Sequence, residues 1–100
     1  MPYSLKLHRD VEKQLKRMSS NDRERVVETM RSLRDEPRPG ACVHLEEILY
    51  RVRVGDYRII YAIFDSELVV FVCKVARRTE ATYRELRAFA TRARGEIHGE

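Results

Sequence analysis

The sequence has no long apolar run and few cysteines. No uninterrupted apolar stretch approaches the roughly 20 residues of a membrane-spanning helix, and the start, MPYSLKLHRDVEK, lacks the apolar core of a signal peptide. The chain has only two cysteines, Cys42 and Cys73, and their spacing fits neither a metal site nor a disulfide framework. We therefore expect a cytoplasmic protein with two free thiols and no membrane segment.

The common nucleotide and metal motifs are missing as well. There is no glycine-rich phosphate loop, no dinucleotide-binding turn and no HExxH motif, so we expect no cofactor and no metal. A chain of 100 residues suits one domain over 1–100. Its 20 basic and 16 acidic residues give a formal net charge of +4, which favours anionic partners without requiring them.

The most informative stretch is 49–61, LYRVRVGDYRIIY. Two runs rich in Val, Ile and Tyr flank Gly55-Asp56, and a glycine opening a two-residue connection is typical of a β-hairpin. If these two residues form the whole turn, Arg53 pairs with Arg58, and alternation along the strands puts Arg51 beside them. We call the side that carries these three arginines the arginine face. The opposite side carries Tyr50, Val52, Val54, Tyr57, Ile59 and Tyr61 and is predicted to face a core.

The pairing of two arginines has a cost. Like charges in a cross-strand pair destabilise a sheet by about 0.2–1 kcal/mol. Such a cost is compatible with a cationic platform for a polyanion such as RNA. The alternative is an ordinary solvated sheet face, which we would favour for one or two arginines but not for three on one hairpin.

The flanking segments predict helices on either side of a sheet. We expect a strand over 3–8, a helix from Arg9 and a second helix capped by Ser20 or Asn21. The buried stripe of the first helix is Val11, Leu15 and Met18, and that of the second is Val26, Val27, Met30 and Leu33.

The second half of the chain predicts a further strand and helix. After a stiff connector at 37–40 and an irregular segment, the nearly continuous apolar run 68–75 predicts a strand buried on both faces. A third helix follows Thr79, and the tail 92–100 is expected to be flexible. The fold class is therefore α+β, with a helical hairpin packed on a four-stranded, antiparallel-rich sheet.

Other basic residues are predicted to extend the arginine face. If a three-residue loop pairs Phe64 with Leu68, Lys74 falls opposite Arg58, whereas a slip or bulge would remove it. Either Arg77 or Arg78 can face the substrate. Arginine is a fork-shaped phosphate binder and Tyr83 can stack on a base, so these residues together describe a site for single-stranded RNA.

These motifs resemble the RelE/ParE superfamily of toxins, and within it the RelE branch. The resemblance covers nearly all of residues 2–87 and rests chiefly on LYRVRVGDYRIIYAI, followed by an apolar strand, a basic ARR turn and a nearby tyrosine. It implies a type II toxin that acts as a metal-independent, ribosome-dependent mRNA endoribonuclease and leaves a 2′,3′-cyclic phosphate. It also implies three partners: a cognate antitoxin, the ribosome with mRNA in its A site, and operator DNA only through the antitoxin.

The resemblance also implies roles for individual residues. The implied catalytic group is Arg51, Arg53, Arg58, Arg78 and Tyr83, and the implied RNA-binding residues are Lys74 and Arg77. Several relatives have lysine at the positions of Arg51 and Arg53. Because guanidinium stays protonated in proteins, these arginines are expected to clamp the phosphate, and proton removal falls to Glu46, Glu47, the ribosome or water. His44 is a less favoured general acid or base.

Two other functions remain open from the sequence. The chain can be a ParE-like inhibitor of DNA gyrase that acts by binding, or a non-toxic module that binds only its antitoxin and operator DNA. The basic cluster and Tyr83 favour the endoribonuclease.

Overall fold

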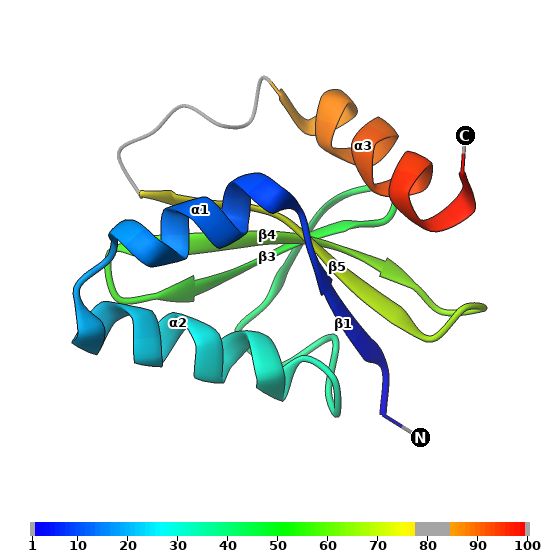
Figure 1. Ribbon diagram of the computed structural model, residues 1–100. Coiled ribbons are helices and arrows are strands. Elements are labelled where there is room, and N and C mark those ends of the chain that lie inside the picture. The colour runs from blue at the N-terminus through cyan, green and yellow to red at the C-terminus, as the bar shows by residue number, and fades with distance from the viewer. Residues whose placement is uncertain (1, 78–84, 100) are drawn as a thin grey trace.

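The computed structural model describes residues 2–77 and 85–99 (Figure 1). The fold is α+β, as the sequence predicts: two helices follow the first strand, and four consecutive strands precede the last helix. In chain order the elements are β1 (Ser4–Leu7), α1 (Arg9–Arg17), α2 (Ser20–Ser32), β2 (Val43–Glu46), β3 (Leu49–Val54), β4 (Tyr57–Phe64), β5 (Val69–Arg77) and α3 (Leu86–His98). Among the described residues, no helix is long and apolar enough to span a membrane.

The sheet has five strands in the order β1-β5-β4-β3-β2, so the prediction of four strands is wrong. The additional strand is β2, which lies in the segment predicted to be irregular. It pairs antiparallel with β3, and its register shifts between His44 and Glu46. The first strand, β1, runs parallel to β5, and the remaining pairs are antiparallel.

The helical hairpin covers one face of the sheet, as predicted (Figure 1). We call this side the hairpin face. The apolar stripes of α1 and α2 pack here against Val52, Tyr57 and Ile59. The second helix begins one residue earlier than predicted, because Ser19 is its N-cap and the Ser19 hydroxyl accepts a hydrogen bond from the backbone N–H of Asp22 at 3.3 Å. Neither Ser20 nor Asn21 therefore has the capping role.

The third helix packs on the opposite face and extends beyond residue 91, while its predicted cap, Thr79, lies outside the described residues. Its residues Phe89, Ala90 and Ala93 are buried against the sheet, and Ile97 is packed at the edge of the same cluster. The helix ends at Gly99, whose φ of +71° is the left-handed conformation that glycine adopts readily at a helix end. Residues 92–98, which the sequence predicts to be a flexible tail, are thus helical.

The predicted connector is fixed at the end of the sheet away from Gly55. The Arg38 guanidinium donates two hydrogen bonds to Asp65, at 3.2 and 2.9 Å, and lies 5.1 Å from the centre of the Tyr50 ring. The Tyr3 hydroxyl also donates to Asp65, at 2.6 Å. These contacts hold the start of β1, the connector and the β4–β5 turn together.

Candidate functional site

The β3–β4 hairpin has the register that the sequence predicts. Arg53 pairs with Arg58, and Arg51 pairs with Ile60. Gly55 has a φ of +57°, and a positive φ at the first turn residue alone is the pattern of a type II′ turn. The three arginines therefore share one face. Arg53 is exposed on it, and the side chains of its two arginine neighbours are half-buried.

The second helix supports the tip of this hairpin from the hairpin face. The Tyr57 hydroxyl donates a hydrogen bond to Asp22 at 3.2 Å. The Arg25 guanidinium lies so close to Gly55 that a Cβ there would be 2.8 Å from one of its nitrogens. No pattern in the sequence predicts this contact, because Arg25 is one of several arginines on a charged helix. The turn is consequently held by α2 as well as by its own backbone.

Lys74 lies on the arginine face, although not in the register that the sequence predicts. Phe64 pairs with Val69 rather than Leu68, and a bulge follows between Tyr61 and Ile60, so Lys74 lies opposite Ile60. The slip and the bulge each shift the pairing by one residue. Because two one-residue shifts restore the original side, the side chain stays on the predicted face.

Arg77 does not share the arginine face. It pairs with Tyr57, a residue of the hairpin-face core, and its guanidinium lies 5.5 Å from the centre of the Tyr57 ring. The two other predicted site residues, Arg78 and Tyr83, lie outside the described residues.

The third helix bounds the arginine face on one side. Phe89 and Ala90 pack over Ile60, Ala62 and Phe71, which occupy the apolar half of that face. A pocket of about 430 Å³ lies where α1, β5 and α3 meet. Its polar lining is Asp10, Lys13, Gln14, Arg17, Lys74, Glu85 and Arg92. Lys74 thus lies between the arginines and this mainly basic pocket. Arg92 and Glu85, which also line the pocket, were not among the predicted site residues.

The predicted proton acceptors lie at different places on the fold. Glu47 forms an ion pair with Arg94 of α3, and this hydrogen-bonded contact lowers the pKa of the Glu47 carboxyl. His44 pairs with Tyr50, so it lies on the hairpin face, with its ring 4.8 Å from the Tyr50 ring. Glu46 is exposed and pairs with Leu49, which lies on the arginine face two residues before Arg51. Among the described carboxylates, Asp10 and Glu85 share a pocket with Lys74.

The site offers fixed positive charge. Guanidinium groups keep their protons and present several donors in a plane, a geometry that matches phosphate oxygens. Three of them on two adjacent strands are held at positions set by the backbone ladder. Within residues 2–77 and 85–99, no group of three His, Cys, Asp or Glu side chains is placed to hold a metal ion. This arrangement can bind a nucleic-acid backbone and stabilise negative charge that develops on a phosphate.

Known proteins are similar to this chain in sequence and in fold. The model of a family described as the ParE toxin of type II toxin–antitoxin system, parDE, matches residues 5–82. The RelE1 protein of Methanocaldococcus jannaschii is 25% identical over 89 residues, covering 84% of this chain and 98% of its own length.

Solved structures of known toxins are also similar to this chain. RelE in the RelE–RelB complex of Pyrococcus horikoshii is 33% identical, with a TM-score of 0.74, over 81% of this chain and 100% of its own. A mutant of the Escherichia coli toxin RelE in the free state is 22% identical and has the same fold, with a TM-score of 0.72 over 93% of this chain and 98% of its own.

Proposed function

The chain belongs to the ParE toxin family of type II toxin–antitoxin systems, and we propose that it is a ribosome-dependent mRNA endoribonuclease. The observation that carries this proposal is the placement of Arg51, Arg53 and Arg58 on one face of a rigid hairpin. Three guanidinium groups at one place suit a phosphate that gains negative charge during a reaction, which an inhibitor that acts only by binding does not have to stabilise.

The proposed reaction is cleavage of the RNA backbone by its own ribose. The 2′ oxygen loses its proton and forms a bond to the adjacent phosphorus, while the bond from phosphorus to the 5′ oxygen breaks. The 5′ oxygen takes up a proton, so the products are a 2′,3′-cyclic phosphate and a 5′-hydroxyl end. The arginines hold the phosphate and stabilise its additional charge in the transition state. Arg78 and Tyr83 complete the proposed site, the first on the phosphate and the second on the base.

The proton of the 2′-hydroxyl must leave by another route, because protonated guanidinium is no base. Glu47 is occupied by Arg94, so we assign this role to Glu46, the ribosome or water. Lys74 extends the cationic surface toward the pocket between α1 and α3. Arg77 lies on the opposite face, so we do not assign it a contact with the RNA.

We infer the partners and the cellular location from the family. The partners are a cognate antitoxin, the ribosome with mRNA in its A site, and operator DNA through the antitoxin, and the location is the cytoplasm. Two relatives, from Mycobacterium tuberculosis and E. coli, were solved as toxin–antitoxin complexes and are 24% and 23% identical to this chain.

The test is to map RNA 5′ ends after brief induction in growing cells. We expect new ends in phase with the ribosomal A site, and we expect Arg58→Ala to abolish both these ends and growth arrest while the protein stays folded. Loss of one transition-state contact typically lowers a rate by about 10²–10³. Arg34→Ala, which removes an exposed arginine after α2, is the control and should cleave normally. Unchanged toxicity of folded Arg58→Ala would contradict the proposal.

A second candidate is inhibition of DNA gyrase, which the ParE description of the matching family favours. In that case induction produces gyrase-linked DNA breaks and leaves mRNA intact. If growth continues despite folded protein, the chain is instead a non-toxic module that binds its antitoxin.

A further inference from the structure

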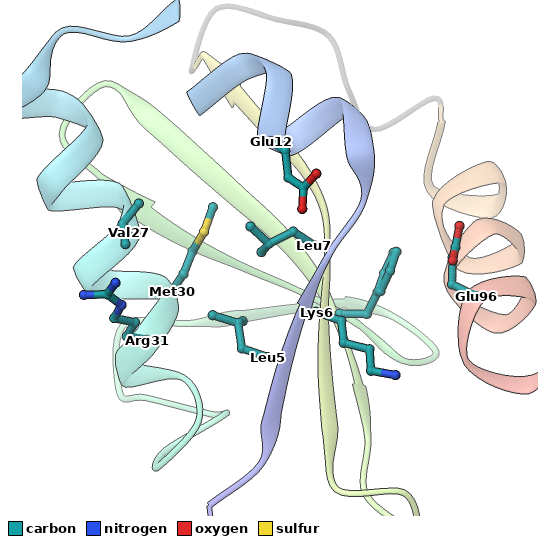
Figure 2. Close-up of a pocket in the computed structure, with 9 residues that line it drawn as sticks. Leu5, Lys6, Leu7, Glu12, Val27, Met30, Arg31 and Glu96 are labelled. Atoms are coloured by element: carbon teal, nitrogen blue, oxygen red, sulfur yellow. The ribbon is translucent and has the colours of Figure 1, made fainter. Parts of the chain in front are cut away.

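A pocket of about 600 Å³ follows β1, and the charges of its lining balance (Figure 2). Figure 2 shows the apolar side chains of β1 on the side of α2 and Lys6 on the other side, toward Glu96 of α3. Two basic and two acidic side chains line this pocket: Lys6, Arg31, Glu12 and Glu96. Neither sign of charge prevails, so this pocket does not select an anion.

The pocket of about 430 Å³ between α1, β5 and α3 differs, because basic side chains prevail in it. We call it the basic pocket. In the described part of the chain the pairing of β1 with β5 ends at Val72, whereas β5 continues to Arg77. The basic pocket lies beside this last part of β5. Four basic and two acidic side chains line it: Lys13, Arg17, Lys74, Arg92, Asp10 and Glu85.

The two acidic residues have a local reason for their positions. Asp10 lies in the first turn of α1, and Glu85 is the N-cap of α3, where a carboxylate interacts favourably with the helix dipole. Lys13 lies in the middle of α1, where the dipole gives no such reason. Lys13 and Arg17 are one turn apart, and like charges at this spacing weaken a helix. The basic side of the pocket therefore calls for another explanation.

Arg92 is the most constrained of the four basic residues. Its guanidinium lies 5.8 Å from the centre of the Phe89 ring, and both Arg92 and Lys74 are half-buried. A positive charge that is partly withdrawn from water is stabilised by an anion. Because Phe89 is 3% exposed, the described lining offers positive charge to an anion and no open ring to a nucleobase.

The basic pocket adjoins the arginine face through Lys74. Lys74 pairs with Ile60, and Ile60 pairs with Arg51. Adjacent strands lie about 4.8 Å apart, so the backbones of Lys74 and Arg51 are about 10 Å apart. A strand of RNA carries a negative charge at every nucleotide. An RNA strand whose cleaved phosphate lies on the arginine face therefore has further phosphates within reach of the basic pocket.

We propose that the basic pocket binds a phosphate of the substrate RNA to one side of the cleaved linkage, through Lys13, Lys74 and Arg92. The inference rests on the proposed function, which supplies the RNA. These side chains do not touch the reacting atoms, so the pocket contributes to RNA binding and not to the chemical step. Ribosomal RNA carries the same phosphates, but the continuity with the arginine face favours the substrate strand.

The first experiment measures mRNA cleavage in a single turnover on isolated ribosomes, at increasing concentrations of toxin. We expect Lys13→Gln and Arg92→Gln each to raise the concentration for half-maximal cleavage about threefold to tenfold, because one charge-assisted contact is lost. The maximal rate should not change. The control is Lys16→Gln, which removes the same charge from an exposed position of α1 outside the pocket and should behave as the wild type.

Thermal unfolding shows first that each variant is folded. Unchanged half-maximal concentrations in Lys13→Gln and Arg92→Gln would overturn the assignment. An equal increase in Lys16→Gln would show that only the net charge matters, and would overturn it too. A lower maximal rate at an unchanged half-maximal concentration would place the residues in the chemical step, which also contradicts the proposal.

The second experiment separates the two sources of phosphate. Single phosphates of the mRNA around the A-site codon are replaced by neutral methylphosphonates. If Arg92 contacts one of these phosphates, its replacement should weaken the wild type about as much as Arg92→Gln does, and the two changes together should cause little further loss. If Arg92→Gln causes the same loss with every modified mRNA, the pocket contacts ribosomal RNA, and the assignment to the substrate strand is overturned.

The outcomes separate this inference from the proposed function. A chain that cleaves mRNA and keeps its half-maximal concentration in Lys13→Gln and Arg92→Gln would refute the pocket and leave the endoribonuclease intact. A wild-type chain that cleaves no mRNA on ribosomes would refute the proposed function, and the pocket would lose its substrate.

Discussion

Arg53 of β3 lies directly across from Arg58 of β4 in an antiparallel pair. Arg53 is exposed and Arg58 is half-buried, so the two positive charges face each other at the border between sheet and solvent. The pair weakens the hairpin that carries the candidate site. We interpret it as a place where stability is lost for the sake of phosphate binding.

Replacing one member of this pair should therefore stabilise the fold. We expect Arg53→Thr to increase the free energy of unfolding by about 0.2–1 kcal/mol while lowering mRNA cleavage. Arg53→Lys keeps the charge and should stay near the wild-type stability. Denaturant unfolding at low and high salt is the measurement, and the difference between the two variants should shrink at high salt because salt screens exposed charges. A Thr variant less stable than the Lys variant at low salt would contradict this explanation.

The hairpin turn depends on glycine at position 55. We expect Gly55→Ala to lower the free energy of unfolding by about 1–2 kcal/mol, because its φ of +57° is unfavourable for a residue with a Cβ. The new Cβ would also meet the Arg25 guanidinium, but that group is the far end of a flexible side chain and can move. Adding Arg25→Ala to Gly55→Ala should thus restore little stability. Full rescue, measured by denaturant unfolding, would show instead that the close contact causes the loss.

His8 should make stability depend on pH. Its ring is 11% exposed and accepts a hydrogen bond from the N–H of Asp10, an arrangement that requires a neutral Nδ1. Burial, followed by the positive charge of Arg92, lowers the pKa of His8, while Asp10 and Glu96 oppose this shift. Below the ordinary pKa near 6.5 the unfolded chain takes up a proton more readily than the folded one, so folding weakens as the pH falls from 6.5 toward the lowered value.

A substitution isolates this contribution. His8→Asn keeps an acceptor at the N-cap but removes the titrating group. The change in unfolding free energy between pH 7 and pH 5 should be smaller in His8→Asn than in the wild type. Equal pH dependence in both proteins would show that other groups cause it.

The two free cysteines should react at very different rates. Cys73 is 1% exposed, and burial raises the pKa of its thiol to about 12. Because the thiolate is the reactive form, Cys73 should resist a thiol reagent until the protein unfolds. Cys42 is half-buried and should react in the native state. Mass spectrometry after brief labelling distinguishes them, and rapid native labelling of Cys73 would contradict its burial.

The longer elements could be predicted because their signals are local. The buried stripe of α2 repeats at helical spacing, and Val26, Met30 and Leu33 are indeed buried. In contrast, β2 is short, interrupted by a bulge and carries the exposed Val43, so its sequence shows no clean alternation. Its strand conformation depends on the hydrogen bonds that β3 offers.

The end of α3 illustrates the same limit. Gly95 and Gly99 are typical of a flexible tail when the sequence is considered alone. In the folded chain Ile97 packs against the sheet, Arg94 pairs with Glu47, and His98 lies 3.2 Å from Glu67. These partners are distant in sequence. Their contacts stabilise the end of a helix that its own amino-acid composition would not stabilise.

The sequence by itself determined that Arg51, Arg53 and Arg58 share a face, because a two-residue turn and strict alternation leave one register. Only the tertiary structure decided that Lys74 joins them and that Arg77 does not. The physical reason is that the length of the β4–β5 loop and a bulge decide on which face of the sheet a β5 side chain lies. Both are fixed only when β5 pairs with β4.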